Sequence, residues 1–158
     1  MERIDKILKN GDYLKYLEKN RLAEKSRIYC RHDITHFLDT ARISYIISLE
    51  ENYRLNKEVL YAAALLHDIG RWMEYESGID HAEASVMLAK KILEDCCFSQ
   101  SESDEILEAI GSHRNRKETS VLGDVLYRAD KLSRNCLMCG AISTCKHFQN
   151  GEKPILLY

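Results

Sequence analysis

The chain has 158 residues, of which 45% are hydrophobic and 30% are charged, and its formal net charge is −2. This mixture is typical of a globular protein and excludes a disordered chain, and the length suits one domain that buries about two-thirds of its unfolded surface. The small net charge gives no overall basic field to attract nucleic acid or an anionic membrane. The N-terminus has no long apolar run, so we expect no signal peptide or transmembrane helix, and we predict a cytoplasmic protein with reduced cysteines.

Apolar residues recur at helical spacing along most of the chain, and the only proline is Pro154. The pattern predicts an all-α protein with about six helices and short connections. The helices are expected at Arg3–Lys19, Ile34–Glu51, Lys57–Ile69, His81–Cys97, Glu102–His113 and Thr119–Arg134. Asp80 and Ser101 each precede an acidic residue by three positions and resemble N-terminal caps, and Gly70 is placed to end the third helix.

Several ionisable residues fall on the apolar faces of these predicted helices. His67, for example, extends a stripe that includes Leu60 and Ala63. The residues that behave in this way are His36, His67, His81, His113 and Asp130, and Asp68 stands beside His67. A single histidine of this kind is usually a hydrogen-bonded core residue, but a converging set of imidazoles and carboxylates is hard to satisfy by hydrogen bonds alone. A divalent metal would compensate the buried charge.

At these residues the sequence resembles the HD-domain superfamily of metal-dependent phosphohydrolases. The family pattern is a His, a His-Asp doublet and a later Asp, carried on an all-helical bundle. Here it reads THFLDTARISYI around His36, LLHDIG at His67 and Asp68, and LYRADKLSR around Asp130. A His-Asp pair alone is weak, but the three segments in this order are specific, and the resemblance covers roughly residues 28 to 135. It implies a compact HD-domain helical bundle.

The resemblance also implies a set of metal ligands. One metal would be held by His36, His67, Asp68 and Asp130. In a binuclear subset of the family, two further histidines hold a second metal, and here Asp68 would bridge to a metal on His81 and His113. His32 lies four residues before His36 and could share its face. We assign His36 because it begins the apolar stripe.

The activity that the resemblance implies is hydrolysis of a phosphate ester or anhydride of a small nucleotide-like substrate through a metal-activated hydroxide. Asp68 would be the catalytic residue, because it could orient the hydroxide as well as bridge. Arg71, Lys131 and Arg134 are near enough in sequence to bind phosphate. One or two divalent ions are expected, and histidine-rich ligation favours Fe, Mn, Co, Ni or Zn over Mg.

The C-terminal segment NCLMCGAISTCKHF has a second candidate metal pattern. Its members are Cys136, Cys139, Cys145 and His147. They could hold a structural zinc or an iron–sulfur cluster, or be ordinary reduced residues. Cys30 is interpreted as a packing residue. The expected organisation is one HD-type helical domain over residues 1–135 and a cysteine-containing tail over residues 136–158, packed on the domain or extending it.

Other functions stay open at this stage. The main alternative is a non-catalytic module that senses a nucleotide or a metal with the same pocket. Within the enzymes, a mononuclear nucleoside-monophosphate phosphatase competes with binuclear phosphodiesterases and dinucleoside polyphosphate hydrolases. The expected partner is a small phosphorylated substrate, with no nucleic acid and no membrane, and the oligomeric state is not predicted.

Overall fold

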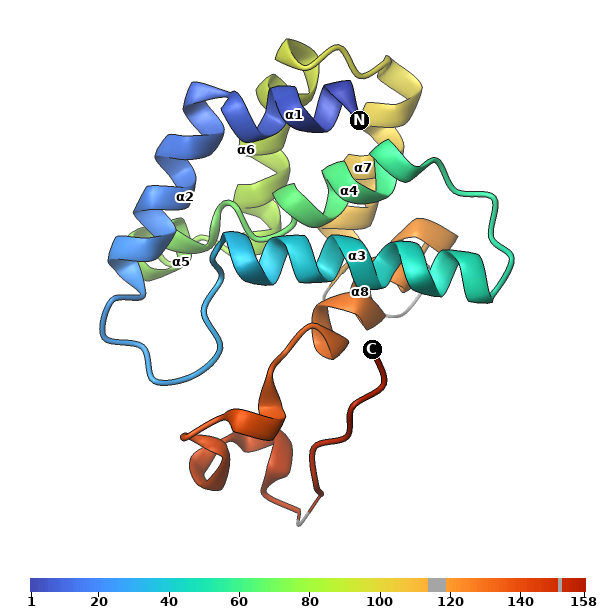
Figure 1. The fold of residues 1–158 in the computed structure, drawn as a ribbon. Helices are drawn as coiled ribbons and strands as arrows, with labels where there is room; N and C mark the ends of the chain where they lie inside the picture. Colours follow the sequence, from blue (N-terminus) through green and yellow to red (C-terminus); the bar gives the residue numbers. More distant parts are fainter. Residues whose placement is uncertain (114–118, 151) are drawn as a thin grey trace.

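The structure, a computed structural model, describes residues 1–113, 119–150 and 152–158. Its α-helices are α1 (Glu2–Lys9), α2 (Gly11–Ala23), α3 (Ile34–Glu50), α4 (Lys57–Leu66), α5 (Arg71–Ser77), α6 (His81–Asp95), α7 (Gln100–Ser112) and α8 (Val121–Leu132) (Figure 1). Three short 3-10 turns follow, η1 (Cys136–Met138), η2 (Ile142–Thr144) and η3 (Lys146–Phe148). Within the described ranges there is no β-strand, and the all-α prediction is confirmed.

Helix α4 forms the centre of the bundle. From Val59 to Leu66 all of its residues except Tyr61 are buried, because α3, α7 and α8 pack around it. A helix that is apolar on every side requires such a position. The last turns of α4 and α8 and the first turn of α3 come together on the side of the bundle that faces the tail (Figure 1).

The prediction of one continuous helix over Arg3–Lys19 is wrong, because the chain forms two helices there, α1 and α2. Asn10 separates them, with its side chain accepting a hydrogen bond from the Tyr13 N–H. An asparagine at this position caps a new helix better than it continues an old one. Ile7 and Tyr13 can thereby both be buried although they lie on helices of different direction.

The third predicted helix is three residues too long, and the prediction that Gly70 ends it is wrong. Helix α4 ends at Leu66, and Gly70 instead precedes α5, a short helix that the sequence pattern did not predict. A Cβ on Gly70 would lie 2.6 Å from the Ser85 backbone nitrogen. Gly70 is therefore required for the close approach of this turn to α6, and its own N–H donates to Ser85 Oγ at 2.9 Å.

The two predicted N-caps have different outcomes. Asp80 caps α6 as expected, accepting hydrogen bonds from the N–H groups of the second and third following residues. Ser101 does not cap α7. Its cap is Ser99, which forms a reciprocal capping box with Glu102. The helix begins earlier because this pair satisfies two backbone N–H groups at once.

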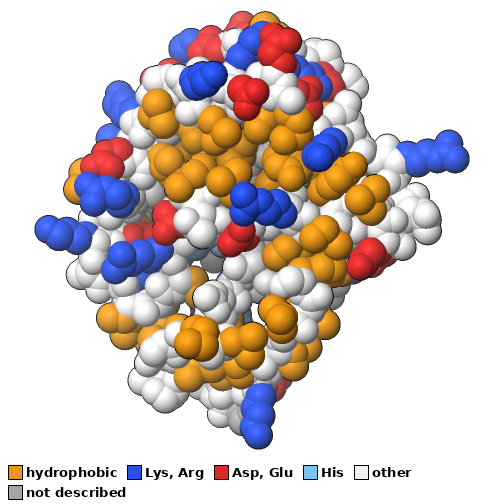
Figure 2. Space-filling model, in the orientation of Figure 1, with side chains coloured by type: hydrophobic (Ala, Val, Ile, Leu, Met, Phe, Trp, Pro, Cys, Tyr) orange, Lys and Arg blue, Asp and Glu red, His pale blue; other side chains and the backbone are white. Residues whose placement is uncertain are grey.

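The tail that follows α8 differs from the bundle. None of the residues from 136 to 150 is buried, and the backbone hydrogen bonds of the three turns are local. Figure 2 shows the molecule hollowed between the bundle and the tail. Among the described helices, none has the length and apolar character needed to cross a membrane.

Candidate metal centre

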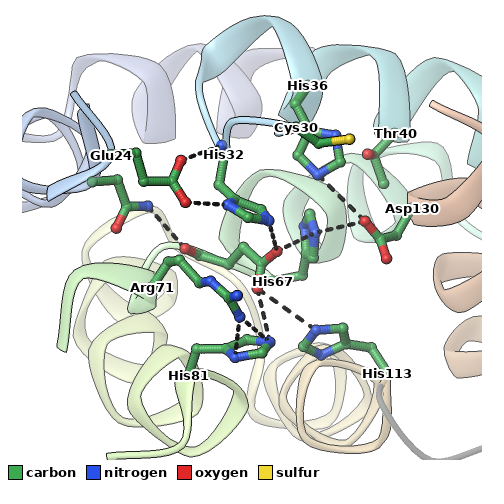
Figure 3. A network of polar contacts seen from close by, with 12 residues as sticks. Glu24, Cys30, His32, His36, Thr40, His67, Arg71, His81, His113 and Asp130 are labelled. Carbon is green, nitrogen blue, oxygen red and sulfur yellow. Dashed lines mark hydrogen bonds and ion pairs between the residues drawn. The ribbon is translucent and has the colours of Figure 1, made fainter. Parts of the chain in front are cut away.

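Six ionisable side chains at or just beyond the ends of five helices meet on the side of the bundle that faces the tail. His36 lies in the first turn of α3, His81 begins α6, His113 follows α7, Asp130 lies in the last turn of α8, and His67 and Asp68 follow α4. Figure 3 shows the histidine rings and Asp130 converging on one centre. The helices thus deliver these polar groups at or just beyond their ends, and all six side chains are almost completely buried there.

Four of the six form one group of close donor atoms. The four are His36, His67, Asp68 and Asp130, whose ligand atoms all lie within 4.8 Å of one another. His36 Nε2 is 3.4 Å from Asp130 Oδ1, and His67 Nε2 is 3.3 Å from Asp68 Oδ2. This spacing could hold one metal ion, and these are the ligands that the family resemblance implies.

The second group shares Asp68 with the first. Asp68, His81 and His113 also have ligand atoms within 4.8 Å of one another. The Oδ1 atom of Asp68 lies 3.3 Å from His81 Nε2 and 3.7 Å from His113 Nε2, while its Oδ2 atom faces His67. The carboxylate therefore presents one oxygen to each group, which is the geometry a bridging ligand needs.

Hydrogen bonds on the opposite nitrogen orient the imidazoles. Ser133 donates its hydroxyl proton to the Asp130 carbonyl at 3.0 Å, so His36 Nδ1, 3.1 Å from Ser133 Oγ, is assigned as the donor to that hydroxyl. His67 Nδ1 lies 2.8 Å from the Ala64 carbonyl oxygen and is likewise a donor. In both rings Nε2 is the nitrogen turned toward the carboxylates, which is the position from which a neutral imidazole ligates a metal.

The two histidines of the second group are held in the same way. His113 Nδ1 lies 2.5 Å from the Ile110 carbonyl. His81 Nδ1 lies between Glu74 Oε2, at 2.6 Å, and the guanidinium nitrogen Nη1 of Arg71, at 2.5 Å. All four rings therefore have Nδ1 engaged outside the centre and Nε2 turned into it. A set of core histidines satisfied among themselves would not need this common orientation.

Several atoms at the centre lack a hydrogen-bond partner in the described part of the chain. They are His36 Nε2, His67 Nε2 and Asp68 Oδ1. Burial alone would raise the pKa of Asp68, but the adjacent imidazoles of His67 and His32 outweigh it and hold that pKa well below its usual range. Burial lowers the pKa of His67, whereas Asp68 and Asp130 raise it, with a net value of about 10. The centre thus favours a positive charge between two ionised carboxylates, and a divalent ion fits that requirement.

A buried asparagine, which the sequence analysis missed, fixes the turn that carries the His-Asp doublet. Asn20 of α2 donates from Nδ2 to the Asp68 carbonyl at 2.9 Å and accepts from the Trp72 N–H at 2.8 Å. Asn20 is fully buried. Its position amid the polar residues of α2 gave no signal, because only the tertiary contact distinguishes it from a surface residue.

His32 lies at the edge of the centre. Its Nδ1 is 2.6 Å from Glu24 Oε1, and its Nε2 is 3.5 Å from Asp68 Oδ2. It belongs to neither group of donor atoms within 4.8 Å in the described residues, whereas His36 belongs to the first. Glu24 is buried and also accepts a hydrogen bond from the Tyr75 hydroxyl. Glu24, a buried carboxylate that the sequence analysis missed, therefore holds His32 beside Asp68.

The centre opens into a cleft of about 500 Å³, lined by the bundle, the loop before α3 and the tail. The three predicted phosphate-binding residues, Arg71, Lys131 and Arg134, all line it. Lys131 Nζ and Arg134 Nη2 lie 2.6 Å and 3.3 Å from Asp130 Oδ2. Two cations that the sequence analysis missed, Arg27 and Lys146, also line the cleft. They come from segments far apart in the chain, so no local motif connects them.

The predicted tail set is not brought together as a metal group. Among the described residues, no three of Cys136, Cys139, Cys145 and His147 have donor atoms within 4.8 Å of one another. His147 faces the cleft instead, with Nε2 at 3.1 Å from Arg134 Nη1.

The family model of the HD domain matches residues 33–135. The chain belongs to the HD-domain family. An uncharacterized protein of Clostridium beijerinckii is 41% identical over 92% of this chain and 92% of its own length. Ribonuclease Y of Treponema denticola is 33% identical over 66% of this chain, but that match is only 19% of the ribonuclease.

A solved structure shows the same fold. The crystal structure of a predicted HD superfamily hydrolase from an uncultured Thermotogales bacterium has a TM-score of 0.60 and 34% sequence identity. The likeness covers 75% of this chain and 66% of that chain. The predicted HD-domain bundle is therefore confirmed.

Proposed function

We propose that the protein is a metal-dependent phosphohydrolase that cleaves a phosphate ester or anhydride of a small nucleotide-like molecule. The observation that carries the proposal is the pair of donor groups that share Asp68 beneath a cationic cleft. Membership of the HD family and the likeness to an HD superfamily hydrolase support hydrolysis in general. To this general activity the proposal adds a substrate class, a small nucleotide-like molecule.

The chain's own residues would perform three tasks. His36, His67 and Asp130 with Asp68 would hold one ion, and His81 and His113 with Asp68 would hold a second. Divalent transition metals bound by such ligands lower the pKa of water and polarise phosphate oxygens. Arg71, Lys131 and Arg134 line the cleft and would bind and neutralise the phosphate. Asp68 would also orient the nucleophile, since it contacts both groups.

The test is a hydrolysis screen on protein loaded separately with Mn, Fe, Co, Ni and Zn. The panel contains nucleoside monophosphates, dinucleoside polyphosphates, cyclic nucleotides and a short oligoribonucleotide. We expect hydrolysis of one of the small substrates, detected by separation of the nucleotide and nucleoside products, and loss of both that activity and bound metal in Asp68→Ala. Full activity in Asp68→Ala would contradict the assignment.

The same screen separates the alternatives. A pure sensing module would bind a nucleotide, detected by calorimetry, without turning over any substrate with any metal. Cleavage of the oligoribonucleotide alone would contradict the predicted absence of a nucleic-acid partner and bring the activity closer to the one that the name of Ribonuclease Y describes.

A further inference from the structure

The cysteines of the tail are more buried than two of its large apolar residues. Cys136, Cys139 and Cys145 are all partly buried, whereas Leu137 and Met138 are 51% and 84% exposed. None of the apolar side chains from 136 to 150 is fully buried, so a hydrophobic core of its own does not hold this segment in place. Small segments without a core usually need a disulfide or a metal.

The tail docks on the loop between α2 and α3. The hydroxyl of Tyr29 lies 3.3 Å from Thr144 Oγ1, and the residues that follow these two are Cys30 and Cys145. A shallow depression is lined both by residues 25–29 and 31 of the loop and by residues 140, 141, 143 and 144 of the tail. Cys30 and Cys145 also line the same cleft beside the metal centre.

The fourth thiol near this site is thus Cys30 of the loop. Consecutive turns link the three tail cysteines, because the Cys139 N–H donates to the Cys136 carbonyl at 3.3 Å and the Cys145 N–H donates to the Ile142 carbonyl at 3.1 Å. Cys30 lines the same cleft as Cys145 and so faces this run of turns. Arg27 holds the loop in this shape by donating from Nε to the Cys30 carbonyl at 2.7 Å. Neither of the remaining cysteines, Cys96 and Cys97 after α6, is part of this arrangement.

We propose that Cys30, Cys136, Cys139 and Cys145 together bind one structural zinc ion that fixes the tail against the loop between α2 and α3. Four thiolates are a common ligand set of structural zinc, with Zn–S distances of about 2.3 Å. The basic groups Arg27 and Arg134, which lie beside these cysteines, offset the excess negative charge of four thiolates on one divalent ion. His147, a member of the ligand set expected from the sequence, is replaced by Cys30 and is left to face the cleft.

Binding requires the thiols to move closer together. No three of the four sulfurs are within 4.8 Å of one another in the described residues. The tail can accommodate this change because its backbone hydrogen bonds are local to its own turns and it has no buried side chain to displace. The ion would then complete the outer wall of the cleft, which includes Thr144, Lys146 and His147.

The test uses cobalt as a spectroscopic substitute for zinc in the full chain. Thiolate ligands give a charge-transfer absorption with Co²⁺, and the His/Asp centre contains no sulfur, so the band reports only the cysteine site. We expect the band in the wild type, its loss in Cys30→Ser and Cys136→Ser, and its retention in Cys97→Ser, His147→Ala and Asp68→Ala. Because Asp68→Ala keeps the band, failure of the proposed hydrolase and failure of this site are distinguishable.

Elemental analysis and proteolysis complete the experiment. Protein purified without an affinity metal should contain zinc that Cys30→Ser loses, while its helical circular dichroism is unchanged. Lys146 is exposed, and chelation should speed trypsin cleavage after it in the wild type because the tail would no longer be fixed to the loop. An undiminished cobalt band in Cys30→Ser, its absence from the wild type, or iron with inorganic sulfide at this site would each overturn the proposal. Loss of the band in His147→Ala with retention in Cys30→Ser would restore the set expected from the sequence.

Discussion

The two walls of the cleft are built in opposite ways. The inner wall is the set of helix ends that carry the six His and Asp residues, and its side chains are at most 9% exposed. The outer wall consists of the loop before α3 and the tail, where no residue from 136 to 150 is buried. The inner wall is positioned by core packing, whereas the outer wall has few contacts to position it.

The two walls meet different requirements for the precision with which their side chains are positioned. Metal ligands must be held within a few tenths of an ångström, and buried helix ends provide that rigidity. Cations that bind a flexible phosphate need less precision and can lie on exposed segments. We therefore expect changes on the inner wall to affect metal binding, turnover and stability, and changes on the outer wall to affect substrate affinity.

Among changes that leave Asp68 in place, the largest effect is expected from His81→Ala, which removes an inner-wall ligand. The second group would lose one of its three members, so metal content should fall by one ion per chain. Turnover should decrease by about two to four orders of magnitude, which corresponds to ~3–5 kcal/mol in the activation barrier. Elemental analysis and steady-state kinetics measure both quantities. His147→Ala on the outer wall is the control and should keep the ions of the inner wall. Unchanged metal content in His81→Ala would favour the mononuclear interpretation.

A smaller effect is expected where the inner wall is packed most tightly. In Gly70→Ala the new methyl group would lie 2.6 Å from the Ser85 nitrogen and 2.7 Å from Ala84. Overpacking of this kind costs about 1–3 kcal/mol in the free energy of unfolding. The matched outer-wall control is Gly140→Ala, which has no atom within 4 Å of the added Cβ. Urea denaturation compares the two, and equal midpoints would show that the turn before α5 can shift.

The outer wall is tested by Lys146→Ala. Lys146 lines the cleft but contacts none of the six His and Asp residues in the described structure. Its loss should raise KM about tenfold, or ~1.4 kcal/mol, and leave kcat unchanged, because it would bind substrate and transition state equally. Lys153→Ala removes a tail lysine outside the cleft and should have no effect. A decrease in kcat instead would place Lys146 in the reaction itself.

The smallest effect is expected far from both walls, at Arg3. Its guanidinium lies 2.6 Å from Glu58 Oε2 and 2.7 Å from Glu102 Oε2, and so ties α1 to α4 and α7. Arg3→Ala should cost about 1 kcal/mol at neutral pH, since the groups are partly exposed. Lys6→Ala, which breaks an exposed pair with Glu2, is the control and should cost less.

The same pair predicts a pH dependence. The hydrogen bond from Arg3 lowers the pKa of Glu102 from 4.5 to about 2. A lowered carboxyl pKa stabilises the folded state above the unfolded pKa, and the contribution disappears as the pH falls from 4.5 toward 2. The stability difference between wild type and Arg3→Ala should shrink over that window in urea titrations. A constant difference would show that packing of Arg3 on Phe98, 4.2 Å from its ring centroid, dominates.

Some features were predictable because they depend on neighbours along one helix. The helical class follows from apolar spacing, and the cap at Asp80 from a local hydrogen bond. The placement of His67 and Asp130 on buried faces follows from the stripes that precede them. Local rules failed at Asn10 and Gly70, where tertiary packing decides between ending one helix and beginning another.

The helical class and the HD pattern are properties of the sequence, and the resemblance to the HD family implied the six residues that the structure brings together at the centre. Five of them extend apolar stripes at helical spacing, and Asp68 is adjacent to one of the five. Three features depend on packing between segments: which oxygen of Asp68 faces which histidine, the contact of Asn20 with the doublet, and the position of Cys30 on the same cleft as Cys145. These depend on contacts between segments up to about a hundred residues apart, for which the order of residues along one helix carries no signal.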